Sequence, residues 1–142
     1  MADNKSKPVI QKETTGCAIA SAAVVAGISY DEAKRVAASL GIHATDSTLW
    51  SETNHIRRLL NRLGIQVGDQ ETPFSTWNRL PDCALLAIKW HVSGGKPHWH
   101  WVVFLRDGPV EQVLDSKKSL KTNIRKDFGR IKPKWFIEVQ TH

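Results

Sequence analysis

The segment from Gln11 to Cys17 holds the residue types of this chain best suited to covalent chemistry. Cys17 opens an alanine-rich stretch that runs to Ala26, so we expect it in the first turn of a helix. A helix N-terminus carries partial positive charge and unpaired N–H groups, which favour a thiolate over a thiol. A thiolate is the nucleophile of acyl-transfer chemistry, and the Gln11 side chain could donate a hydrogen bond to the oxyanion that forms.

His100 is the candidate for the base that such a nucleophile needs. The dipeptide Asp107-Gly108 is a turn signal between two apolar runs, and a two-residue turn there places Asp115 directly opposite His100. An aspartate in that position would hold one ring nitrogen and fix the tautomer of the base. Because Pro109 has no N–H to close so tight a turn, the alternative register is shifted by one pairing step. In that register Asp115 is diagonal to His100 but still on the same face.

His98 is the alternative base, since residues two apart in a strand share a face. We favour His100 because it lies inside the apolar run, where its neighbours would hold the ring rigidly. His98 follows Pro97 and is expected at the frayed start of the strand.

Four residues in this order, Gln11, Cys17, His100 and Asp115, resemble the papain-like cysteine peptidases. The closest likeness is to the bacteriocin-processing branch, which cleaves after double-glycine leaders. The resemblance extends from Gln11 to about Val139. It implies a Cys-His-Asp triad that acts through a thioester, with Gln11 and the Cys17 N–H binding the oxyanion.

Two residues depart from the pattern of that family. Ala18 follows the nucleophile where the family usually has glycine, and Ser116 follows the aspartate where the branch commonly has proline. The departures bear on the substrate more than on the chemistry. The chain resembles a free-standing relative of this branch, and the resemblance implies a peptide or protein substrate. It does not imply that this substrate is a double-glycine leader. A deamidase, an isopeptidase or a transferase would use the same site.

These side chains need helices in the first half of the chain and strands in the second. The first helix begins near Cys17, with Thr14 or Thr15 as its cap, and ends at Gly27. The other expected elements are a helix between the Ser29 cap and Gly41, a helix over 48–63, strands over 84–90, 99–105, 110–114 and 135–139, and a loop over 93–97. This order predicts an α+β, papain-like fold, with the helices packed on an antiparallel sheet. We expect residues 1–10 to be a flexible arm and residues 11–142 to form one domain.

The composition is that of an ordinary globular protein, with 41% hydrophobic and 24% charged residues in 142. No apolar run has membrane-spanning length and no secretory signal is evident, so we expect a cytoplasmic protein, with export by a non-classical route left open. Two cysteines do not make a disulfide framework, and Cys83, ahead of an apolar run, is expected in the core. Cys17, His98 and His100 lack metal-site spacing, and we expect no metal or cofactor.

The positive charge of the chain is concentrated between Lys117 and Lys134. This segment has eight basic residues and one acid, whereas the rest of the chain has a net charge of −1. Such a segment is typical of a solvated face, or of a patch that contacts nucleic acid or an acidic partner. The alternative function is therefore a non-catalytic binding module that uses this segment. The two functions could also coexist, with the patch recruiting the substrate.

Overall fold

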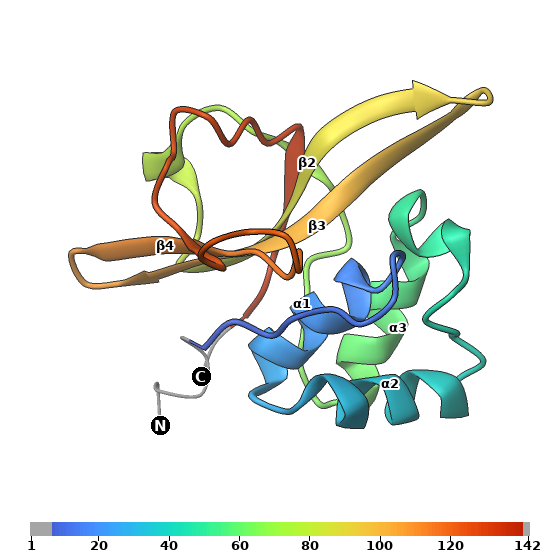
Figure 1. Ribbon diagram of the computed structural model, residues 1–142. Helices are drawn as coiled ribbons and strands as arrows, with labels where there is room; N and C mark the ends of the chain where they lie inside the picture. Colours follow the sequence, from blue (N-terminus) through green and yellow to red (C-terminus); the bar gives the residue numbers. More distant parts are fainter. Residues whose placement is uncertain (1–6, 141–142) are drawn as a thin grey trace.

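The computed structural model describes residues 7–140, and there three α-helices pack on a six-stranded antiparallel sheet (Figure 1). This arrangement confirms the predicted α+β class. Most of the predicted N-terminal arm, residues 1–6, lies outside the described residues. The helices are α1 (Cys17–Ala26), α2 (Tyr30–Ser39) and α3 (Asn54–Arg62), with short 3-10 turns η2 (Ser47–Trp50) and η3 (Trp77–Arg79).

The sheet has the strand order β1-β6-β2-β3-β4-β5. Its centre is the hairpin of β2 (Cys83–Ser93) and β3 (Lys96–Asp107), whose tip projects beyond the other strands (Figure 1). β4 (Val110–Leu114) continues the sheet on one side of this hairpin, and β6 (Trp135–Glu138) continues it on the other. The two-residue strands β1 (Thr72–Pro73) and β5 (Ile124–Arg125) lie at the edges and were not predicted from the sequence.

Helix α1 is the central helix of the fold. Nine of its ten residues are buried, because α2, α3 and β3 all pack against it. A helix that is apolar on all sides is suited to such a position, and the alanines allow close approach of its neighbours. One face of the sheet packs on these helices around Trp101 and Val103. The other face, around Val102 and Phe104, is covered by aromatic side chains from the 74–77 and 128–136 segments.

The caps of the first two helices were predicted in part. α2 begins as expected, since the Ser29 hydroxyl accepts a hydrogen bond from the Glu32 N–H. α1 ends as expected at Gly27, which has a left-handed φ of 72°. The predicted threonine cap of α1 is wrong, because Gly16 is the N-cap and no side chain caps it. The Thr15 hydroxyl instead donates to the carbonyl of Ala44 and ties the helix start to the loop after α2.

The predicted helix over 48–63 is two elements, η2 and α3, and the single helix is wrong. Residues 47–50 form a 3-10 turn, and residues 51–53 separate this turn from α3. The Trp101 indole donates a hydrogen bond to the carbonyl of Leu49 at 3.0 Å and so ties the 3-10 turn to β3.

The two hairpin turns also differ from the prediction. The expected 93–97 loop is a two-residue turn in which Gly94 and Gly95 have φ of 61° and 78°, as a type I′ turn requires. In the β3–β4 hairpin Asp107 pairs with Val110, so the turn residues are Gly108 and Pro109. Gly108 has a φ of 58°, which suits the first central position of a type II′ turn, and proline fits the second. The register is the one shifted by one pairing step, and the direct opposition of His100 and Asp115 is wrong.

Candidate active site

Cys17 lies at the first residue of α1, where the helix meets β3 (Figure 1). Its sulfur accepts a hydrogen bond from the backbone N–H of Trp101 at 3.4 Å. That N–H is free for the sulfur because β4 pairs with β3 only as far as Val103. Cys17 is fully buried, with 0% of its surface exposed. The prediction that Cys17 begins the helix is confirmed. Nothing in the sequence indicated that other residues would cover the thiol completely.

The start of α1 is held in place from the side by α2. The Tyr30 hydroxyl donates to the carboxylate of Glu13, which also pairs with Lys34 at 2.6 Å. Gly16 leaves room for this hydroxyl, since a Cβ at Gly16 would lie 2.2 Å from the tyrosine oxygen. The glycine before the cysteine is therefore required by packing. No side chain fits between α2 and the first turn of α1.

His100 and Asp115 form the central pair of the site. The Nε2 atom of His100 lies 2.7 Å from Oδ1 of Asp115, although the two residues are diagonal in the sheet. Burial lowers the pKa of His100, but hydrogen bonds and charge interactions with Asp115 and Cys17 outweigh it and raise the pKa to about 9. With Nε2 engaged by Asp115, Nδ1 is the ring nitrogen left for Cys17. The imidazole is thus bonded to the carboxylate, and the thiol of Cys17 is the second group that raises its pKa.

Asp115 is 1% exposed and is held by several donors. Besides His100, the Lys117 N–H donates to its Oδ1 at 3.1 Å and the Arg125 guanidinium donates to its Oδ2 at 3.1 Å. Burial raises the pKa of the Asp115 carboxyl, but the hydrogen bond and charge of His100, with these donors, hold it below its usual range. Asp115 is therefore a carboxylate that can orient the imidazole.

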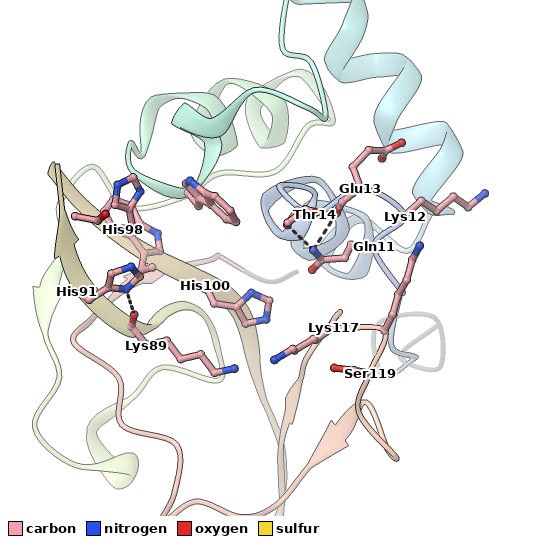
Figure 2. Close-up of a pocket in the computed structure, with 14 residues that line it drawn as sticks. Gln11, Lys12, Glu13, Thr14, Lys89, His91, His98, His100, Lys117 and Ser119 are labelled. Atoms are coloured by element: carbon pink, nitrogen blue, oxygen red, sulfur yellow. Dashed lines mark hydrogen bonds between the residues drawn. The ribbon is translucent and has the colours of Figure 1, made fainter.

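Gln11 is next to the site but makes contacts that the sequence did not predict. Its amide nitrogen donates to the carbonyls of Glu13 at 3.0 Å and Thr14 at 2.9 Å (Figure 2). Its amide oxygen accepts from the Ser116 hydroxyl at 2.6 Å, and its backbone N–H donates to the Ser116 carbonyl at 3.0 Å. In this arrangement both amide protons are engaged by the loop before Cys17. Gln11 thus ties the segment that carries the cysteine to the segment that carries the aspartate.

His98 has no comparable partner. The prediction that His98 lies at a frayed strand start is wrong, because β3 begins at Lys96 and His98 pairs with His91 across the hairpin. Its Nδ1 is buried and has no hydrogen-bond partner among residues 7–140. The preference for His100 over His98 therefore rests on the contact with Asp115.

A cavity of about 600 Å³ lies beside His100, and we call it the His100 cavity. Its walls come from the 11–14 loop, the projecting β2–β3 hairpin and residues 117–119 (Figure 2). His100 is part of its lining, whereas Cys17 is not. The imidazole consequently stands between the cavity and the buried sulfur.

Sequence reasoning missed Arg125 and Ser116 as parts of this site. Arg125 belongs to the basic 117–134 segment, and β5 brings it beside Asp115 by pairing with β4. The sequence held one signal for Arg125. Asp127 is the single acid of that segment, and it pairs with Arg125 at 2.8 Å. Cys83 is in the core of β2 as predicted, with 2% of its surface exposed.

No protein-family model, curated protein or solved structure matches this chain. In the part of the chain that the structure describes, no helix has both the length and the apolar character needed to cross a membrane. Among residues 7–140, no three His, Cys, Asp or Glu side chains are grouped as a metal site would require.

Proposed function

We propose that this chain is a papain-like cysteine peptidase or a related amide-bond hydrolase. Cys17 is the nucleophile, His100 the general base and acid, and Asp115 the residue that orients the imidazole. The observation that carries this proposal is the position of His100, which interacts with the thiol of Cys17 and lies 2.7 Å from Asp115.

The first half of the reaction forms a thioester. With a pKa of about 9, His100 is protonated at neutral pH, and Cys17 reacts as the thiolate, which is the nucleophilic form of a cysteine. The thiolate attacks the amide carbon, and the carbonyl oxygen becomes an oxyanion. As the C–N bond breaks, His100 gives its proton to the leaving amine.

The second half returns the enzyme to its starting state. The neutral His100 takes a proton from water, and the hydroxide attacks the thioester carbon. The C–S bond then breaks, which releases the carboxylic acid and restores the thiolate beside a protonated His100. Asp115, buried and ionised, stabilises the imidazolium at both ends of the cycle.

The oxyanion needs hydrogen-bond donors near the sulfur. The backbone N–H of Cys17 is a donor of this kind, because the first N–H groups of a helix have no partner within the helix. Gln11 would be the second donor, and it must release Glu13 or Thr14 to serve. Since Cys17 is fully covered, a covering segment must also move before a substrate reaches the sulfur. Both requirements point to the 11–16 loop as the segment that rearranges.

Alkylation by iodoacetamide with peptide mapping tests this proposal, and Cys83 is the internal control. Both cysteines are buried, so a passive thiol at either position would react slowly. We expect Cys17 to react at least about tenfold faster than Cys83, and His100→Ala to abolish that difference. His98→Ala, on the same strand, is the matched control and should leave it in place. Equal, slow labelling of both cysteines would contradict the proposal, and loss of the difference in His98→Ala alone would show that His98 is the base.

The complete burial of Cys17 favours a second function, a binding module without catalysis. A buried cysteine is often a small core residue, and α1 is packed on all sides. In that case the basic 117–134 segment would contact nucleic acid or an acidic partner. The alkylation experiment separates the two functions, because a core thiol would not depend on His100.

A further inference from the structure

A second cavity, of about 460 Å³, lies on the other side of Lys89 from the His100 cavity. Lys89 lines both cavities, so the two are neighbours. We call the second one the basic cavity, since five of its nine lining residues are cationic and none is acidic. The cations are Lys89, Arg125, Arg130, Lys132 and Lys134.

Most of these cations form no close ion pair with an acid in the described part of the chain. Arg125 pairs with Asp115 at 3.1 Å and with Asp127 at 2.8 Å. Among residues 7–140 the other four cations form no ion pair within 4.0 Å, and neither do Lys117 and Lys118 in the His100 cavity. Like charges gathered around a concave surface repel one another and raise the local concentration of anions. An anionic ligand would relieve this repulsion.

The backbone conformation and the surroundings of Lys89 are both energetically unfavourable. It lies in a β-bulge, where β2 has one residue more than β3 between the Ile88 and His91 pairs. Its φ is 54°, a left-handed conformation that non-glycine residues seldom adopt. The bulge turns its ammonium group toward that of Lys117 below the ring of His100 (Figure 2). Desolvation and the neighbouring Lys117 lower the pKa of Lys89. Backbone strain and like-charge contact thus coincide beside the proposed reaction centre.

We propose that the His100 cavity and the basic cavity form one groove that binds an acidic polypeptide segment. This inference rests on the proposed function for the cleavage itself, and it names the substrate class. The amide to be cleaved lies beside His100, and a run of Asp or Glu on one side of it extends past Lys89 toward Lys132. The ammonium groups of Lys89 and Lys117 meet the first of these carboxylates.

The aromatic lining of the basic cavity favours a polypeptide over a nucleic acid as the ligand of that part of the groove. Proteins that bind single strands offer exposed aromatic faces for base stacking. The one indole of the basic cavity, Trp90, is already covered by the Lys134 ammonium at 4.6 Å from its ring centroid. Carboxylates need only the cations, and Lys89, Arg130 and Lys132 form no ion pair within 4.0 Å among residues 7–140.

Binding can be measured without cleavage, in the full-length Cys17→Ala variant. The probe is a fluorescein-labelled peptide of glutamate and glycine, titrated by anisotropy at low and high ionic strength. We expect specific binding that weakens with salt, as charge screening requires. Lys132→Glu should weaken it about tenfold, whereas the charge-matched Arg35→Glu on α2 should change it less than about twofold. Both side chains are exposed, so neither change should affect folding.

Three results would contradict the proposed groove. The first is that the acidic peptide does not bind, and the second is that Lys132→Glu and Arg35→Glu weaken peptide binding equally. The third is that a single-stranded oligonucleotide of the same charge binds more tightly than the peptide and that Lys132→Glu weakens this binding too. The proposed function fails separately, through the alkylation of Cys17. If the peptide binds but Cys17 is unreactive, the proposed groove is supported and the proposed hydrolase is contradicted. If Cys17 is reactive but the peptide does not bind, the hydrolase is supported and the groove is contradicted.

Discussion

His100 reaches Asp115 diagonally across the β3–β4 hairpin, with 2.7 Å between Nε2 and Oδ1. The residue directly opposite the Asp115 position in this register is Val102, on the same face as His100. A diagonal pair is farther apart at its Cβ atoms than an opposed pair, so the long imidazole spans the gap. This geometry leaves Nδ1 as the ring nitrogen that does not face the carboxylate.

The stability of the protein should fall as the pH rises from about 6.5 to about 9. His100 has a folded pKa of about 9 against 6.5 for a free histidine, so its interactions stabilise the fold fully below the lower value and are lost above the higher one. The loss is on the order of 3 kcal/mol. Urea unfolding across this range measures it. His100→Gln should remove most of the slope, and an unchanged slope would assign it to another group.

Arg125→Gln should raise the pKa of His100 further. Arg125 and His100 share the carboxylate of Asp115, and without the guanidinium the carboxylate interacts with His100 alone. The same change should lower the free energy of unfolding by about 1–3 kcal/mol, because a buried carboxylate loses a donor. NMR titration of the His100 ring measures the pKa. A decrease of that pKa would contradict the shared-carboxylate geometry.

Gln11→Glu should destabilise the protein more than Gln11→Ala does. A carboxylate in place of the amide would face the carbonyls of Glu13 and Thr14, which need donors. We expect the glutamate variant to be less stable by about 1–3 kcal/mol, measured by thermal unfolding. Ser116→Ala is the companion variant, since it removes only the contact to the amide oxygen. If Gln11→Glu had the stability of the wild type, the two carbonyl contacts would not hold in solution.

Gly16→Ala should reduce the reactivity of Cys17 and lower stability, and Tyr30→Phe should partly restore both. The added Cβ would lie 2.2 Å from the Tyr30 hydroxyl, and removal of that oxygen relieves the closest clash. The double-mutant cycle, followed by thermal unfolding and by alkylation of Cys17, should show a coupling of about 0.5–3 kcal/mol. Strict additivity of the two changes would show that α2 does not set the start of α1.

Local signals in the sequence were enough to predict α1, the cap of α2 and β4. Each depends on neighbouring residues, such as Ser29 ahead of Glu32, or Gly27 after an apolar run. The structure also brings the three candidate residues, Cys17, His100 and Asp115, close together, from the start of a helix, a strand and the end of the next strand.

Features that depend on distant residues could not be predicted. The 3-10 turn η2 is tied to β3 by the indole of Trp101, which is 52 positions from Leu49. The left-handed backbone at Lys89 could not be predicted, because glycine or asparagine normally indicates this conformation and the bulge contains neither. Arg125 reaches the site only because β5 pairs with β4, and a two-residue strand leaves no periodic pattern.

The Gly108–Pro109 turn fixes the pairing register on which the contact between Asp115 and His100 depends. Neighbouring positions of a strand alternate between the two faces of the sheet, so a slip of one residue in this register would direct the carboxylate toward the helices. The imidazole would then be left without its partner. The conformation of two turn residues at the tip of the hairpin therefore decides which face of the sheet the carboxylate occupies.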